Sequence, residues 1–155
     1  MAFFRLLHLR DWDEDMGRFS DVGFIHSGDG TGVSVVLKQC TEAAALETGD
    51  GVATRLAAYY PTFVPIVVWI IYEVPDGVNI VDVPSDTGDE CHKGLVFPGE
   101  SKRKQREAAL AFYRENAWPS PPLESSGEYW AVDGTSLVQV HNLEATVKSL
   151  GWTPS

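Results

Sequence analysis

A continuous apolar segment, IVVWIIYEV, occupies residues 66–74. It is rich in β-branched and aromatic side chains, and it is apolar on both faces of an extended chain. Strands that are buried on both faces have this composition. The segment therefore predicts a central strand, around which the rest of the chain forms a sheet.

A turn signal follows this segment directly. Pro75-Asp76-Gly77 places proline early and glycine late, as β-turns prefer. The next residues, Val78–Val83, largely alternate apolar and polar side chains. We therefore expect Ile66–Val74 and Val78–Val83 to pair as a hairpin at the middle of the sheet.

Two more hairpins are predicted where turn residues separate short apolar runs. The turns are Gly28–Gly32 and Asp133-Gly134, which supply residues that tolerate positive φ. A first strand is expected at Phe3–Leu9. The paired segments are Val22–His26 with Val33–Gln39, and Tyr129–Val132 with Leu137–Val140.

Helix signals lie between the strand segments. Ser101–Asn116 is the clearest helix, and Asn142 can cap a last helix that Gly151 closes. Earlier in the chain, Thr41 is a candidate N-cap for strong helix formers, and a second helical pattern runs over Val52–Tyr60. We expect two short helices, or one broken helix, in that region.

The length and the order of these elements predict the fold class. A chain of 155 residues has the size of one domain. Strands cluster in the first half and recur near the end, without regular βαβ alternation. We predict an α+β fold: a single globular domain over residues 1–155, with a mostly antiparallel sheet of hairpins packed against about three helices.

Composition limits the partners and the location. The formal net charge is −10, which disfavours nucleic acid, because phosphate backbones attract basic surfaces. The apolar run Val64–Ile71 is far shorter than the roughly 20 residues that cross a bilayer, and the N-terminus lacks a signal-peptide pattern. We expect a cytoplasmic protein without a membrane partner, in which Cys40 and Cys91 are reduced thiols.

Patterns that could bind a metal or a phosphate fail on spacing. Met16 and Val22 stand where a calcium loop that begins at Asp11 needs Gly and Glu. The glycines of Gly28–Gly32 lead into a strand, whereas a phosphate-binding loop leads into a helix. The histidines and cysteines show no metal-ligand spacing. We expect no metal and no cofactor.

Polar residues inside apolar strands are further candidates. Arg5 costs free energy to bury unless it is paired, and Glu73 is its expected partner in a structural ion pair. The chain also resembles the pattern of ADP-ribosyltransferase-type toxin domains at three positions. These are an Arg on the first strand, Ser34 on a later strand, and Glu47 or Glu73 further on. The resemblance implies an NAD-using enzyme, in which Arg5 would hold a cofactor phosphate and the Glu would stabilise the positively charged ribose.

Aromatic residues beside loops are candidates for binding: Trp12, Trp118, Tyr129 and Trp130. No assembled catalytic motif is evident, so we predict a non-catalytic module that binds a protein or a small molecule. One alternative is the NAD-using transferase-like enzyme. The other is an acidic protein of the immunity or antitoxin type that binds a basic partner, an association that should weaken with added salt.

Overall fold

The computed structural model describes residues 1–60, 65–83, 90–117 and 128–153. Strand β5 (Ile66–Ile71) is buried along its whole length. It lies between β1 (Phe3–His8) and β8 (Glu128–Asp133), and all six of its residues pair with β1. The prediction of a central strand buried on both faces is confirmed.

The main sheet has seven strands in the order β6-β7-β4-β1-β5-β8-β9, and every neighbouring pair is antiparallel. Its other strands are β4 (Val33–Leu37), β6 (Asn79–Asp82), β7 (His92–Val96) and β9 (Ser136–Gln139). A separate two-stranded sheet pairs β2 (Trp12–Asp13) with β3 (Arg18–Phe19). The predicted α+β class with a mostly antiparallel sheet is confirmed.

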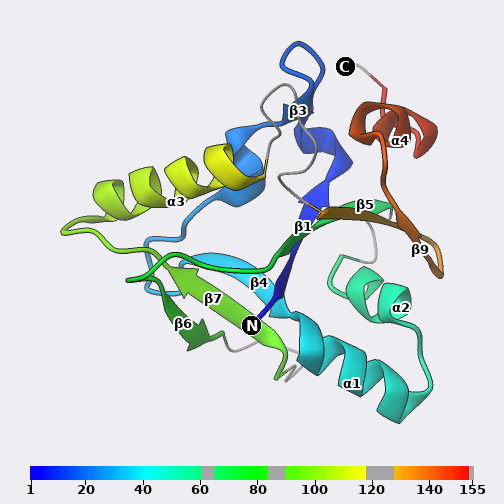
Figure 1. Cartoon of the computed structure of the whole chain (residues 1–155), viewed down its shortest axis with the longest axis horizontal. Helices are drawn as coiled ribbons and strands as arrows, with labels where there is room; N and C mark the ends of the chain where they lie inside the picture. The colour runs from blue at the N-terminus through cyan, green and yellow to red at the C-terminus, as the bar shows by residue number, and fades with distance from the viewer. Residues whose placement is uncertain (61–64, 84–89, 118–127, 154–155) are drawn as a thin grey trace.

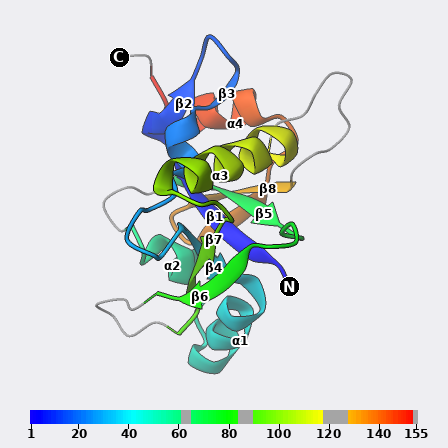
Figure 2. The same cartoon turned by 90° about the vertical axis from the view of Figure 1, so that its left-hand side faces the viewer.

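Helices cover both sides of the sheet (Figures 1 and 2). On one side lie α3 (Lys102–Asn116) and α4 (Leu143–Ser149), near the β2–β3 pair. On the other side lie α1 (Lys38–Thr48) and α2 (Val52–Ala57). Two short 3-10 helices, η1 (Leu9–Asp11) and η2 (Asp21–Phe24), connect the first strands. In the ranges that the structure describes, no helix is long and apolar enough to cross a bilayer.

The sheet separates two hydrophobic clusters. Under α3, the ring of Phe24 packs against Trp69 and Tyr113, with centroid distances of 5.6 and 5.1 Å. On the side of α1 and α2, Leu56 is fully buried in a second cluster that includes Phe4. Aromatic rings bury large apolar areas, so the cluster under α3 is the larger part of the hydrophobic core.

The predicted hairpin of Ile66–Val74 with Val78–Val83 is wrong. Both edges of β5 are occupied by β1 and β8, which leaves no edge for β6. The predicted turn does form, because the Val78 amide donates to the Pro75 carbonyl at 3.3 Å and Gly77 has a φ of 90°. After this turn the chain reaches the far edge of the sheet, where β6 pairs with β7.

The predicted hairpin of Val22–His26 with Val33–Gln39 is also wrong. Residues 21–24 form η2 instead, and Phe24 enters the core. An isolated bridge, Ser27↔Gly32, lies in the turn between the two segments, while β4 pairs with β1 and β7. By contrast, the hairpin of β8 and β9 is confirmed, with Gly134 at a φ of 62° in its turn.

Side-chain caps account for two of the helix starts. Ser101 accepts from the Lys104 amide at 3.2 Å at the start of α3, and Asn142 accepts from the Ala145 amide at 3.0 Å at the start of α4. The cap at Asn142 is as predicted, and so are the two short helices α1 and α2. Thr41 is not a cap, because α1 begins at Lys38, directly after β4, and the Thr41 hydroxyl donates to the Leu37 carbonyl at 2.9 Å.

Cys40 and Cys91 form a disulfide, so the prediction of two reduced thiols is wrong. The two residues lie far apart in sequence, but β4 runs straight into α1 and also pairs with β7. The Leu37 amide donates to the Cys91 carbonyl at 2.8 Å, which places the first turn of α1 beside the start of β7. The Cα atoms of the two cysteines are 5.4 Å apart, within the usual range for a bridge.

The loop Ser27–Gly32 lies directly against β7. Gly32 has a φ of +66°, and a Cβ there would collide with the carbonyl group of Leu95. A Cβ on Gly94 would collide with the carbonyl oxygen of Thr31. The two backbones approach this closely only because neither glycine has a side chain.

Asp29 organises the same loop, and we expect its hydrogen bonds to persist in acid. Its Oδ1 accepts from the hydroxyls of Ser27 and Thr31, both at 2.6 Å, and from the Thr31 amide at 3.0 Å. These bonds lower the pKa of Asp29 from 3.8 to about 2. Because the folded-state pKa is lowered, the stabilisation is present above the ordinary pKa and is lost as the pH falls through about 2.

An NMR pH titration that follows the Thr31 amide will measure this midpoint. Asp29→Asn is the matched control, since it keeps the shape of the side chain and removes the titrating group. A Thr31 midpoint at the ordinary aspartate pKa would contradict the role given to the two hydroxyls.

Candidate binding site

Arg5 lies where two central strands separate. The pairing of β1 with β4 ends at Phe4↔Val36. Beyond that point, Arg5 Nε donates to the Gly23 carbonyl and Nη1 donates to the Ser34 carbonyl, both at 2.8 Å. Burial lowers the pKa of Arg5 from its ordinary value, although a guanidinium stays charged in proteins. Arg5 therefore ties β1 to β4 and η2 through backbone carbonyls.

The structural ion pair predicted for Arg5 and Glu73 is not formed. Within the described residues, no carboxylate pairs with Arg5, and Glu73 is exposed beyond the end of β5. Glu47 is exposed near the end of α1, on the opposite side of the sheet from the Arg5 side chain. The structure thus brings Arg5 to Ser34 and brings neither glutamate to them.

The side chain of Ser34 faces away from Arg5. Its neighbours Val33 and Val35 belong to the cluster under α3, so Ser34 lies on the α2 side. There its Oγ lies 2.5 Å from Nε2 of His92 on the adjacent strand. The His92 ring packs against the ring of Tyr59, with a centroid distance of 5.9 Å. The arrangement is a polar link between β4 and β7.

We expect Arg5→Met to lower the free energy of unfolding by about 3 kcal/mol, because two inward-facing carbonyls lose a charged donor. Arg5→Lys is the matched control. It keeps the positive charge but lacks the planar fork that serves both carbonyls, so it should lose about half as much. Urea denaturation measures both values, and an unchanged stability of Arg5→Met would refute the role proposed for the guanidinium.

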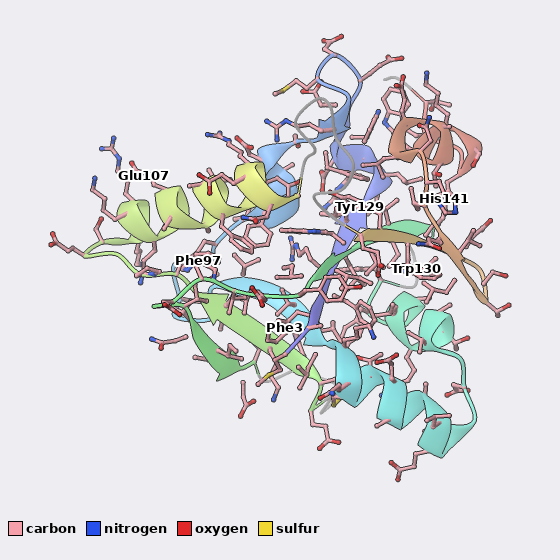
Figure 3. The ribbon with its side chains drawn as sticks, in the orientation of Figure 1. Phe3, Phe97, Glu107, Tyr129, Trp130 and His141 are labelled. Atoms are coloured by element: carbon pink, nitrogen blue, oxygen red, sulfur yellow. A yellow bond between two sulfur atoms is a disulfide. The ribbon has the colours of Figure 1, made fainter. Side chains whose placement is uncertain are left out.

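The aromatic binding candidates are placed differently from one another. Tyr129 is only 6% exposed, and its hydroxyl donates to the Ala117 carbonyl, so it belongs to the core rather than to a binding surface (Figure 3). Trp130 is half-buried on the other side of β8, and its Nε1 donates to Glu128 at 3.1 Å. Trp118 lies outside the described residues.

Trp12 is buried and has an unusual polar atom. The residue is 5% exposed and packs edge-on against Phe19, at a centroid distance of 5.2 Å. Its indole Nε1 is buried and has no hydrogen-bond partner among the described residues. A buried donor without an acceptor costs about 1–3 kcal/mol, so an acceptor supplied by a ligand would be stabilising at this position.

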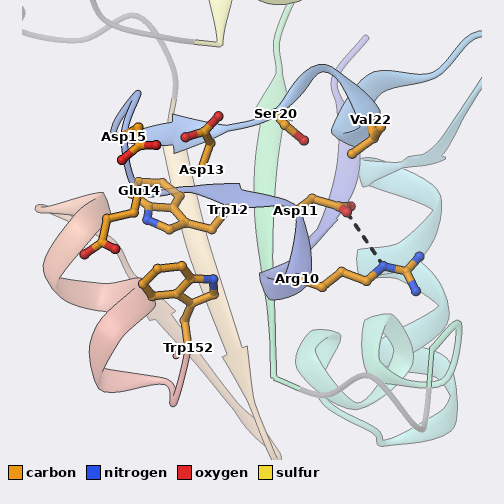
Figure 4. A pocket seen from close by; sticks show the side chains of 9 residues that line it. All are labelled: Arg10, Asp11, Trp12, Asp13, Glu14, Asp15, Ser20, Val22 and Trp152. Carbon is orange, nitrogen blue, oxygen red and sulfur yellow. Dashed lines mark ion pairs between the residues drawn. The ribbon is translucent and has the colours of Figure 1, made fainter. Parts of the chain in front are cut away.

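Trp12 also lines a pocket of about 360 Å3 at the surface. The wall combines the acidic loop Asp11–Asp15 with the start of η2 and with Trp152, which follows α4 (Figure 4). Trp152 is partly buried against the core under α3, and its amide donates to the Val147 carbonyl at 3.2 Å. The lining residues are Arg10, Asp11, Trp12, Asp13, Glu14, Asp15, Ser20, Val22 and Trp152.

The charge around this pocket is strongly negative. Four carboxylates and one guanidinium line it, and Arg10 pairs with Asp11 at 3.7 Å. Two further arginines on nearby elements, Arg18 and Arg114, both pair with Asp21, and the hydrogen bond from Arg114 lowers the pKa of Asp21. The carboxylates of Asp13, Glu14 and Asp15 therefore dominate the field at the pocket.

This chemistry suits a cationic ligand better than a metal ion. Carboxylates attract positive charge, and indole faces attract cations through their quadrupoles. Across the ranges that the structure describes, no group of three or more His, Cys, Asp or Glu residues could hold a metal ion.

Comparison of the chain with known families, curated proteins and solved structures finds no match. The site therefore has to be interpreted from its own residues. Sequence reasoning found Trp12 and the acidic loop separately, but it missed Trp152. The pocket exists because α4 brings the end of the described chain back against that loop, and no local pattern in the sequence carries this information.

Proposed function

We propose that the protein is a non-catalytic binding module, and that its binding site is the pocket between the acidic loop and Trp152. The observation that carries the proposal is the joint lining of one pocket by four carboxylates and two indoles. The ligand is a protein or a small molecule. A nucleic-acid partner is disfavoured by the net charge of −10.

An NMR screen tests this proposal. Labelled protein is titrated with small ligands and tripeptides of positive, neutral and negative charge, and the indole N–H signals of Trp12 and Trp152 are followed. Trp130 supplies an internal control, because its indole is hydrogen-bonded to Glu128 and does not line the pocket. Shifts confined to Trp12 and Trp152 support the module. Ligands that shift only the signals of other residues would refute the proposed site, and so would a screen in which no ligand binds.

The sequence and the disulfide point to different cellular compartments. The sequence favoured the cytoplasm, whereas a disulfide such as Cys40–Cys91 is usually kept in an oxidising compartment. A cytoplasmic protein would carry the two thiols reduced. Alkylation of the thiols in intact cells, followed by mass spectrometry, distinguishes the two compartments.

The NAD-using alternative has no observation in its favour, because Glu47 and Glu73 are both exposed and neither lies with Arg5. Millimolar NAD should leave the melting temperature unchanged. The alternative of an acidic protein that masks a basic partner is compatible with the pocket and leads to a more specific proposal.

A further inference from the structure

We propose that the pocket binds a basic segment of a partner protein, with a Lys or Arg side chain among the carboxylates and a neighbouring peptide carbonyl at the indole N–H of Trp12. This inference rests on the proposed function and specifies its ligand. It starts from two separate observations, the unpartnered N–H and the charge of the wall.

The Trp12 N–H requires an acceptor. The residue is more than nine-tenths buried, and its Nε1 has no partner in the described part of the chain. Figure 4 shows this nitrogen on the ring edge that faces Trp152, which lines the same pocket. A ligand that completes the site must therefore carry a carbonyl or another acceptor oxygen, because an indole can only donate.

The charge of the wall excludes most acceptors. A free carboxylate or a phosphate would accept from Trp12, but it would enter a pocket lined by Asp11, Asp13, Glu14 and Asp15. Like charges placed together at an interface cost affinity. The acceptor is therefore neutral, and a positive charge elsewhere on the ligand would be attracted by the same carboxylates.

A basic peptide combines both groups. Its backbone carbonyls are neutral acceptors, and an ammonium or guanidinium on the next side chain supplies the positive charge. Arg10 offsets only part of the negative wall, since it pairs with Asp11. The partly buried face of Trp152 adds an aromatic surface on which an arginine or lysine can rest.

The pocket volume agrees with this occupant. About 360 Å3 lies at the lower end of the range for ligand sites. A single long side chain with its peptide group fits such a volume, whereas a folded domain does not. The partner therefore presents a protruding basic segment rather than a flat surface.

Three peptides test the inference by NMR: acetyl-Gly-Lys-Gly-amide, its norleucine counterpart and its glutamate counterpart. We expect the lysine peptide to shift the Trp12 indole N–H signal and to bind at least about fivefold more tightly than the norleucine peptide. The glutamate peptide should not bind. Raising the salt concentration should weaken the lysine complex, because the carboxylates are close to solvent.

Variants assign the two contacts. Glu14→Gln with Asp15→Asn removes two exposed carboxylates and should weaken the lysine peptide about fivefold. Asp50→Asn with Glu115→Gln is the matched control, since it removes the same charge from exposed positions outside the pocket and should leave affinity unchanged. Trp12→Phe keeps a core ring and removes the N–H, so it should weaken binding severalfold.

The outcomes separate the two proposals. Equal binding of the lysine and norleucine peptides at Trp12 would overturn the cationic ligand while leaving the binding module intact. Binding of the lysine peptide that leaves the Trp12 indole signal in place would overturn the contact between the peptide carbonyl and Trp12. If none of the three peptides binds but other ligands in the wider screen do, the basic segment is refuted and the module stands.

Discussion

Gly94→Ala is expected to lower the free energy of unfolding by about 3 kcal/mol or to prevent folding. The new Cβ would lie inside contact distance of the Thr31 carbonyl oxygen and close to Val83. Backbone cannot move aside as a flexible side chain can, so the loop Ser27–Gly32 would have to leave β7. Chemical denaturation measures the loss.

Gly30→Ala is the matched control in the same loop. Gly30 has a φ of +95°, but a Cβ there would meet nothing within 4 Å. It therefore tests the strain of a positive φ without the collision, and about 1 kcal/mol is expected. If Gly94→Ala cost no more than Gly30→Ala, the close approach of the loop to β7 would not constrain the fold.

Loss of the Cys40–Cys91 disulfide is expected to cost about 4 kcal/mol. The bridge spans a sequence separation of 51 residues. Closing a loop of that length lowers the conformational entropy of the unfolded chain, and this raises the free energy of the unfolded state by about 4 kcal/mol. The wild-type protein should therefore unfold at clearly lower denaturant concentration after reduction. Its m-value should rise as well, because the reduced unfolded chain exposes more surface.

The double variant Cys40→Ala/Cys91→Ala is the control for reduction. Its denaturation midpoint should match that of the reduced protein and should not respond to reductant. Equal stability of oxidised and reduced wild-type protein would contradict this prediction, because it would show that the bridge gives no net stabilisation through the unfolded chain.

Features coded by neighbouring residues could be predicted from the sequence. The apolar run over β5, the Asp-Gly turn between β8 and β9, and the cap at Asn142 each depend on a few adjacent side chains. These elements were confirmed because their local preferences agree with their places in the fold.

Features that depend on distant segments could not be predicted. The turn at Pro75-Asp76-Gly77 forms, yet the strands on either side of it do not pair, because β1 and β8 occupy both edges of β5. The disulfide requires that β4 lead into α1 and also pair with β7. Neither fact can be read from the spacing of two cysteines.

The candidate site shows the same division. The acidic loop and Trp12 stand out as residue types, but their neighbour Trp152 lies some 140 positions later in the chain and reaches them through α4. Arg5 was recognised as costly to bury, although its partners are carbonyls rather than Glu73. Backbone acceptors are present at every position, so a sequence cannot indicate which of them a side chain will reach.

The covalent link between Cys40 and Cys91 has a consequence for how the protein withstands proteases. Any single peptide-bond cleavage between the two cysteines leaves the fragments attached to each other. The severed chain keeps its original mass, apart from one added water, until a reductant separates the pieces. The central strand β5 lies within this enclosed segment, so a nicked molecule retains the strand on which both of its neighbours depend.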